Sequence, residues 1–351
     1  MLTRILVVAM KRSEIITRLI IIVVIIGTIA TPFWIWARTP LIHARIAENG
    51  GWSPNFLRAK VGEPLHLHLT SDDVTHGFAV GQMDMQSVDV LPGKVTDVTL
   101  IFDKPGTYTF YCTRWCGINH WRMRGTIEVS GSVSYAPTPA PKLLYATLGL
   151  NIDASHPASV IPVEKPSAIR GTLVAAQLPQ SYLDQKYLTT EYYRSHSPAQ
   201  AFTDLRADPA LQSLTDPEVW DLVAYLWQSN LTPLELAYGQ RLYAQNCSAC
   251  HGEKMEGDGV FAEKLVALGQ NSSSEMSGDP SQTVKKPANL GDPVSMYGAN
   301  PALLEGKVSR GGMGTRMPSW GSIFSGEQIK SIVGYLYTCM FDYASSWIPM
   351  R

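Results

Sequence analysis

The sequence predicts a multidomain chain: an N-terminal transmembrane helix, then an all-β sandwich, then an all-α region. Three patterns predict this order. Residues 19–37 are strongly apolar, residues 50–131 alternate apolar and polar positions, and the chain after residue 143 carries helix-capping signals followed by helical spacing. A chain of 351 residues has room for two or three domains. The net charge of −1 and the lack of a basic patch interleaved with aromatics argue against a nucleic-acid partner.

The apolar run at residues 19–37 is about long enough to span a bilayer, given ~1.5 Å rise per residue and a ~30 Å core. Trp34 and Trp36 would lie in the outer aromatic belt. Residues 1–18 carry four basic side chains and should stay cytoplasmic: Arg4, Lys11, Arg12 and Arg18. The alternative is a cleaved signal peptide, but the apolar run is long for one and shows no clear cleavage site. We therefore expect a single-pass anchor in the cell membrane, with the later domains on the periplasmic side.

Residues 50–131 read as a β domain. Leu65, Leu67 and Leu69 alternate with His66 and His68, so the two histidines should share one face of a strand. Such a pair could bind a metal ion, but we expect solvated strand residues. Further β-favouring runs lie at residues 98–102, 108–111 and 126–129. The segment between the last two runs carries most of the chemistry.

That segment begins at Cys112 and continues with Cys116, His120 and Met123. Thiolates, imidazole and thioether are soft or borderline ligands, which favour copper over hard cations. A mononuclear blue-copper site needs only one of the two thiols, whereas two thiolates can bridge two copper ions. Each ion then needs an imidazole, which His120 and His76 could provide. A disulfide and a zinc site are the alternatives.

The pattern Cys-x3-Cys-x3-His-x2-Met, with a Val-Thr-His-Gly-Phe segment upstream, resembles the binuclear CuA site of subunit II of haem–copper oxidases, with B-class character. The resemblance covers residues 52–129 and implies a cupredoxin sandwich at residues 50–131. It implies this ligand set: Cys112 and Cys116 as bridges, His76 and His120 on one copper each, Met123 as a weak axial ligand, and the backbone carbonyl of Arg114. Many A-class relatives have Glu at that last position and bind magnesium through it, so Arg114 predicts no magnesium site.

Residues 132–142 are Pro-rich and read as a linker. Residues 143–231 contain no cysteine. The sequence near the end of this segment nevertheless aligns with the sequence near the end of the haem domain. Capping boxes start at Thr215 and Ser325, and without a gap Tyr225 falls on Tyr335. Residues 143–231 are then either a duplicated cytochrome domain that lost its haem or unrelated helices that look alike. We expect the two histidines in this segment to be structural or surface residues: His156 and His196.

Residues 232–351 read as a c-type haem domain. The capping box at Thr232 opens a helix that runs into Cys247-Ser-Ala-Cys250-His251, and Cys-x-x-Cys-His is the attachment motif for c-type haem. A redox disulfide and zinc are the alternatives. The step Met317-Pro resembles the axial Met-Pro of class I cytochromes c, and Met313 is a poorer candidate.

Three further segments of this domain carry expectations. Residues 286–290 resemble the loop packed on the haem edge in class I cytochromes c, and residues 270–283 read as an inserted loop. We expect Cys339 to be a buried thiol that packs as a small hydrophobe.

These parts predict an electron-transfer chain without substrate chemistry of its own. We expect binuclear copper (CuA) and one covalently bound haem c in an electron-input subunit of a membrane respiratory complex, resembling cytochrome c oxidase subunit II. The expected partners are a haem–copper catalytic subunit I and an electron donor, which could be a cytochrome c, a cupredoxin or a quinol-oxidising complex. The alternatives are the CuA subunit of a nitric-oxide reductase and a membrane-tethered carrier with no catalytic partner. Nitrous-oxide reductase needs a histidine-rich propeller, which eight histidines cannot supply.

Overall fold

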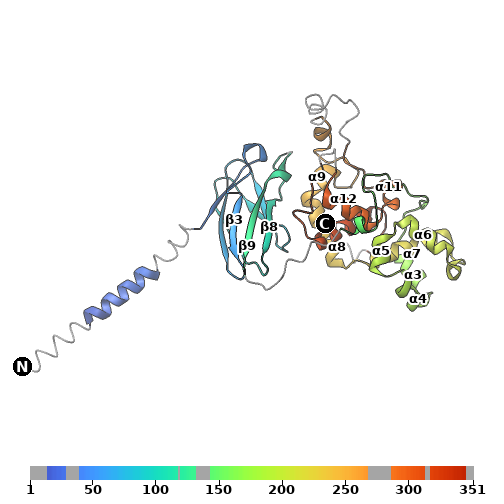
Figure 1. Ribbon diagram of the computed structural model, residues 1–351, viewed down its shortest axis with the longest axis horizontal. Helices are drawn as coiled ribbons and strands as arrows, with labels where there is room; N and C mark the ends of the chain where they lie inside the picture. Colours follow the sequence, from blue (N-terminus) through green and yellow to red (C-terminus); the bar gives the residue numbers. More distant parts are fainter. Residues whose placement is uncertain are drawn as a thin grey trace, which may run out of the picture.

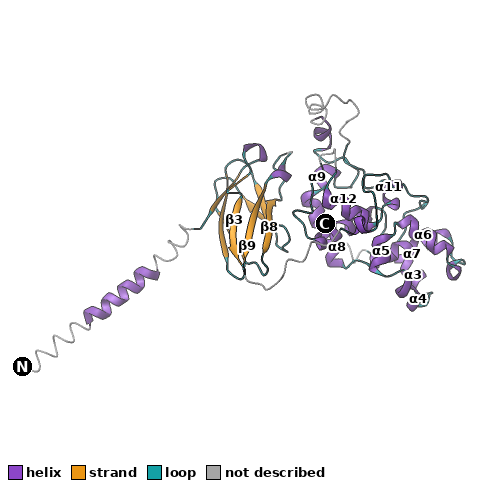
Figure 2. Ribbon diagram, viewed as in Figure 1, coloured by secondary structure: helices purple, strands orange, loops and turns teal. Residues whose placement is uncertain are grey.

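The computed structural model describes residues 14–28, 39–117, 119–131, 143–267, 286–312 and 317–344. A β sandwich lies between an N-terminal helix at residues 14–28 and a larger helical part built from residues after 143 (Figures 1 and 2). The predicted order of an all-β domain followed by an all-α region is therefore confirmed. The predicted linker at residues 132–142, the inserted loop at 270–283 and Met313 lie outside the described residues.

The β domain consists of two sheets. The first has the order β2-β1-β4-β7 and the second has the order β3-β9-β8-β5-β6. The strands are β1 (Leu41–Ala44), β2 (Trp52–Ser53), β3 (Phe56–Lys60), β4 (Leu65–Ser71), β5 (His76–Val80), β6 (Val88–Val90), β7 (Thr96–Leu100), β8 (Gly106–Cys112) and β9 (Arg124–Ser130). The short 3-10 helices η1 (Ala47–Asn49) and η2 (His120–Arg122) interrupt the loops. The first sheet includes β1, which precedes the boundary that we predicted at residue 50.

The core of the sandwich comes from the alternation seen in the sequence. Leu67, Leu69 and Phe110 are almost fully buried between the sheets. The expectation of solvated histidines holds for His66 but is wrong for His68, which is buried. The register of β4 on β7 sets His68 opposite Asp97, and the His68 Nδ1 lies 2.5 Å from the carboxylate. Alternation along one strand cannot reveal such a partner on the next.

The helical part is built from many short helices. They are α2 (Leu144–Thr147), α3 (Ala168–Ala175), α4 (Gln180–Lys186), α5 (Thr190–Ser195), α6 (Pro198–Ala207), α7 (Asp216–Ser229), α8 (Pro233–Asn246), α9 (Ser248–His251), α11 (Pro293–Gly298), α12 (Pro301–Arg310) and α13 (Gly326–Leu336), with η3 (Pro209–Leu211), η4 (Tyr337–Cys339) and a further turn at 262–267. The predicted capping boxes at Thr215, Thr232 and Ser325 are all formed and start α7, α8 and α13.

One apolar core runs through the whole helical part. The last described residues lie within it, because Phe341 and Tyr343 are nearly fully buried. The Phe341 ring packs on Trp227 of α7 with a centroid distance of 6.0 Å. The backbone of Asp342 also pairs with that of Ser167, just before α3. Residues 341–343 therefore complete the core around α3 and α7.

The N-terminal residues form a helix over 14–28. Within the ranges that the structure describes, no helix combines the length and the apolar character needed to cross a membrane. The described helix includes the exposed ion pair Glu14–Arg18, and residues 29–37 of the predicted span lie outside the described residues. The structure therefore does not support the predicted transmembrane helix at 19–37.

Candidate metal and haem sites

The metal site lies where β5 and β8 meet. His76 begins β5 and Cys112 ends β8, and the antiparallel register pairs Phe78 with Cys112. Both site residues are buried, with exposed fractions of 0% for His76 and 1% for Cys112. Because side chains alternate along β8, Phe110 and Cys112 point to the same side, and Phe110 lies in the core. The sheet core thus fixes the positions of the first two predicted ligands.

The structure gathers the other predicted sulfur ligands around these two. The Cys112 Sγ lies 3.8 Å from both the Cys116 Sγ and the His76 Nδ1. The candidate ligand atoms of His76, Cys112 and Cys116 all lie within 4.8 Å of one another. The Met123 Sδ is 3.3 Å from the Cys116 Sγ, and the Arg114 carbonyl oxygen is 3.3 Å from the Cys112 Sγ. The two thiols are free and form no disulfide.

His120 supplies the observation that tests the fit to a metal ion. Its side chain is buried, and neither ring nitrogen has a hydrogen-bond partner among the residues that the structure describes. Leaving a buried polar atom unsatisfied costs about 1–3 kcal/mol, so such atoms usually have a ligand or a partner. The His120 ring nitrogens lie outside the group of His76, Cys112 and Cys116, whose ligand atoms are all within 4.8 Å of one another, although His120 follows Cys116 in the same loop. Together with Met123, these residues offer two thiols, two imidazoles and a thioether. This donor set fits copper better than a hard cation.

Residues outside the ligand set hold the ligands in place. The Asp73 carboxylate lies 2.7 Å from the His76 Nε2, which leaves the His76 Nδ1 to face the thiols. Asp73 is itself fixed by the backbone N–H of Ile46 at 2.7 Å. Trp52 donates its indole N–H to the Met123 carbonyl at 3.1 Å. Such outer partners orient metal ligands. Our sequence reasoning gave no role to Asp73, although its position three residues before His76 was a usable signal.

The two thiols differ strongly in acidity before any metal binds. The hydrogen bond from Cys116 is the main cause that lowers the pKa of Cys112 to about 3. The same hydrogen bond, together with burial, raises the pKa of Cys116 above its usual range. The pair therefore favours one thiolate and one thiol, and a cation is needed to hold both as thiolates.

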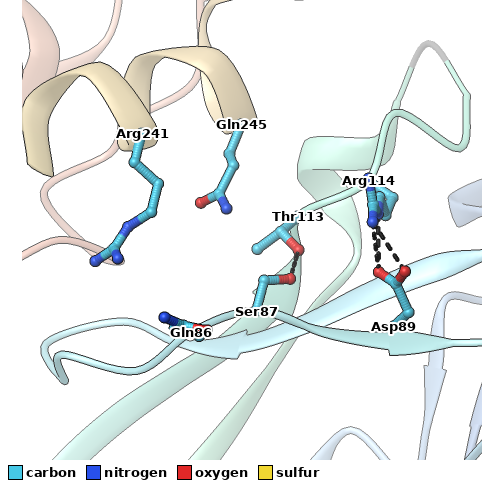
Figure 3. A pocket seen from close by; sticks show the side chains of 7 residues that line it. All are labelled: Gln86, Ser87, Asp89, Thr113, Arg114, Arg241 and Gln245. Carbon is cyan, nitrogen blue, oxygen red and sulfur yellow. Dashed lines mark hydrogen bonds and ion pairs between the residues drawn. The ribbon is translucent and has the colours of Figure 1, made fainter. Parts of the chain in front are cut away.

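Arg114 lies at the edge of this site and faces a cleft of about 240 Å³ (Figure 3). Its guanidinium forms two hydrogen bonds to Asp89, at 2.9 and 2.8 Å. Arg241 and Gln245 of α8 line the opposite side of the cleft, and Ser87 and Thr113 are hydrogen-bonded at its base. The Arg114 side chain is therefore bound to a carboxylate, and only its carbonyl faces the thiols.

The second site follows α8. The backbone N–H of Cys247 donates to the Tyr243 carbonyl, and α9 then presents Cys250 and His251 within one turn. The His251 Nδ1 lies 3.0 Å from the Ala288 carbonyl oxygen. A carbonyl only accepts, so the Nδ1 carries the proton and the Nε2 is left as the ligand atom. The predicted haem-edge segment 286–290 thus contributes the residue that orients His251.

The environment of this second site is apolar. Burial raises the pKa of Cys247 to about 12 and that of Cys250 to about 11, and it lowers the pKa of His251. Burial therefore keeps both thiols protonated and the imidazole neutral near pH 7. Met317 is half-buried against the helical core, and its carbonyl accepts from the Gly312 N–H at 3.3 Å. Cys339 is half-buried, and its Sγ lies 3.0 Å from the Met255 Sδ.

Two family models match the two sites. Residues 55–130 match the model described as the periplasmic domain of cytochrome c oxidase subunit II. The predicted resemblance is confirmed. Residues 235–336 match the model described as subunit III of cbb3-type cytochrome c oxidase. The chain thus joins a subunit II-like copper domain to a cytochrome c domain, a combination that serves electron transfer.

Individual relatives are similar to about a fifth of this chain. A Thermus thermophilus protein named cytochrome c oxidase subunit 2 is 40% identical over 79 residues, which are 22% of this chain and 58% of the relative. Nitrous-oxide reductase of Ralstonia nicotianae is 38% identical over 76 residues, 20% of this chain and 12% of the relative. Among solved structures, the periplasmic domain of subunit II of cytochrome oxidase (CoxB) of Bradyrhizobium japonicum is 26% identical, with a TM-score of 0.20 over 22% of this chain and 54% of that one. The chain therefore spans less than two thirds of the length of each.

Proposed function

We propose that this chain is the electron-input subunit of a membrane respiratory complex of the cytochrome c oxidase type. The observation that carries the proposal is the group of His76, Cys112 and the half-buried Cys116, together with the buried, unsatisfied imidazole of His120. A subunit II-like domain with this group, followed by a Cys-x-x-Cys-His segment, has two sites that could each pass on an electron, and we expect the substrate chemistry to take place in a separate subunit. When bound, a copper pair and a haem each take up one electron and release it.

In the copper domain, Cys112 and Cys116 would bridge the two copper ions of CuA. His76 and His120 would each bind one ion, and Met123 and the Arg114 carbonyl would complete the set. The chain's own contribution is to hold these donors at fixed positions. Asp73 keeps the His76 ring oriented, and the sheet core buries His76 and Cys112.

In the helical domain, Cys247 and Cys250 would attach one haem c covalently. His251 would bind the iron through its Nε2, because the Ala288 carbonyl holds the proton on its Nδ1. Met317 would be the second axial ligand. His/Met ligation raises the haem potential, which suits a carrier that hands electrons to copper.

The proposed partners are a haem–copper catalytic subunit I in the membrane and an external donor, which would be a cytochrome c, a cupredoxin or a quinol-oxidising complex. We infer attachment to the membrane by a single pass from the apolar residues 19–37. In the helix 14–28, the large apolar side chains are each at least half exposed, and an apolar surface of this kind is typical of a membrane contact. The soluble domains would then lie on the periplasmic side.

The test is purification of the intact protein from detergent-solubilised membranes. We expect a large haem–copper subunit to co-purify and the complex to consume oxygen. Consumption of nitric oxide instead would assign the chain to a nitric-oxide reductase. Purification without any catalytic subunit would leave only the tethered-carrier alternative.

The cofactor assignment is tested separately by metal analysis and by one substitution. We expect two copper ions per haem in the purified chain. Cys116→Ser should abolish the mixed-valence copper signal and leave the haem spectrum unchanged. A retained mixed-valence signal would contradict the bridging role of Cys116.

A further inference from the structure

The copper domain and the helical domain are in close-packed contact beside β8 (Figure 1). A Cβ added at Gly81 would overlap the carbonyl oxygen of Ile323, so only glycine permits this approach. Tyr111 of β8 is nearly fully buried in the helical core, where its ring packs edge-on to Phe324 at 5.9 Å. Polar contacts surround this patch: Thr109 and Arg124 with Ser322, Gln82 with Gln328, and Asp84 with Arg241. The contact therefore fixes how the two sites face each other.

Within this contact, Trp115 links the two sites. Its ring lies 4.0 Å from the His120 ring, centroid to centroid. On the other side, the same indole meets the Phe261 ring at 5.9 Å and 73°. Phe261 is in turn hydrogen-bonded to the haem segment, because its backbone N–H donates to the Ala249 carbonyl at 2.9 Å. Ala249 lies between Cys247 and Cys250.

Building on the proposed function, we propose that Trp115 and Phe261 form the bridge for electron transfer between the haem site and the copper site within this chain. The step carries one electron from ferrous haem to the oxidised copper pair; no bond forms or breaks and no proton moves. Two ring contacts and one hydrogen bond connect the proposed copper ligand His120 to the helix that carries Cys250 and His251. Trp115 acts through His120 and Phe261, so it is a bridging residue and not a ligand.

The substitution that tests this role is Trp115→Leu. Leucine keeps an apolar side chain over the metal loop but cannot reach both rings. Trp115→Phe is the conservative variant, because it keeps an aromatic ring beside His120. The matched control is Trp121→Leu, since Trp121 also neighbours His120 and packs against the helical core but has cation–π partners, Arg122 and Arg124, within its own domain.

The measurement is made on the full-length protein with both cofactors, using a photoexcited ruthenium complex to reduce the haem. In the unsubstituted chain, haem reoxidation and copper reduction should share one rate constant. We expect Trp115→Leu to lower that constant by roughly tenfold or more, equivalent to about 1.4 kcal/mol in activation free energy. Trp115→Phe should recover most of the rate, and Trp121→Leu should leave it unchanged. The copper signal and both reduction potentials should stay the same in all three variants.

The contact itself is tested without relying on electron transfer. Gly81→Val should separate the domains, and hydrogen exchange should then rise at residues 79–82 and 322–324, also in the copper-free chain. Gly326→Ala is its control, because an added Cβ there meets no atom within 4 Å. Trp115→Leu should not raise exchange at these residues, which separates a lost bridge from lost docking.

The outcomes separate the bridge from the function on which it rests. If electrons move in the unsubstituted chain and equally fast in Trp115→Leu, the bridge is wrong and the proposed function stands. If Trp121→Leu slows transfer as much as Trp115→Leu, the effect belongs to packing and the bridge is again wrong. If no electron passes between the sites in the unsubstituted chain, the proposed function is contradicted, and the bridge is contradicted with it.

Discussion

Residues 143–231 and the region after residue 232 each contain a pair of closely packed helices: α3 with α7, and α8 with α13. The two regions differ in the segment that follows the first helix of each pair. In residues 143–231, Gly171 of α3 lies against the Asp221 carbonyl and the Tyr225 Cβ of α7. In the haem region, Gly239 of α8 lies in the same way against Ser331 and Tyr335 of α13. Asp221 and Ser331 also correspond in the gap-free alignment of the two capping boxes. This correspondence favours the duplication hypothesis over chance similarity.

The difference lies in how each crossing is completed. After α8 come the two thiols and the imidazole of α9. After α3 come α4 and α5, where Tyr182, Tyr187 and Tyr192 form a cluster and Tyr193 packs on Trp227 of α7. In residues 143–231 the carboxylate of Asp221 is buried where α3 and α7 cross. It accepts two hydrogen bonds from the Arg170 guanidinium, at 2.6 and 2.8 Å. A close helix crossing is therefore a scaffold that can be completed by a cofactor or by side chains.

The largest expected effect is on haem attachment. The double variant Cys247→Ser with Cys250→Ser should lose all covalently bound haem, because the region 143–231 has no cysteine to replace these thiols. Haem staining of the denatured chain and the absorbance spectrum measure this loss. Any covalent haem that remains would break the distinction between the two regions.

The next effect is on the haem potential. Met317→Ala should leave haem attached but lower its potential, because an axial thioether favours the ferrous state. A redox titration of the purified chain measures the shift, and Met313→Ala is the control that should show none. An unchanged potential in Met317→Ala would move the axial role to Met313.

A matched glycine pair tests the shared crossing itself. Gly171→Ala and Gly239→Ala should each destabilise their region by about 1–3 kcal/mol, because the added methyl group must displace a packed backbone carbonyl. Urea unfolding followed by circular dichroism and by haem absorbance separates the two regions. A near-zero cost at only one of the two positions would show that the crossings are not equivalent.

The smallest expected effect concerns the hydrogen bonds that Asp208 accepts within residues 143–231. A hydrogen bond from Lys186 and another from Tyr187, both at 2.7 Å, hold the pKa of Asp208 well below its usual range. The folded-state pKa is depressed, so its stabilisation is present above the unfolded value of about 3.9 and is lost as pH falls through the folded value.

Asp208→Asn should therefore lower stability at pH 7 by about 1–2 kcal/mol, and the difference from the unsubstituted chain should shrink below about pH 4. Thermal unfolding at a series of pH values measures both effects. A constant difference across this range would mean that the charge of Asp208 plays no part.

Local signals in the sequence predicted a large share of this molecule. The spacing of Cys112, Cys116, His120 and Met123 places these residues in one loop, and three capping boxes start helices where they were expected. Contacts between distant segments were not predictable. The approach of Gly81 to Ile323 and the pairing of His68 with Asp97 depend on tertiary packing and on strand register. Asp73 was overlooked because its role depends on the ring orientation of His76.

The burial of Phe341 and Tyr343 beside α7 has a consequence for biosynthesis. The region 143–231 leaves the ribosome well before these two rings do. Its packing against Phe341 and Tyr343 can therefore form only after the segment that carries the Cys-x-x-Cys-His motif has been translated.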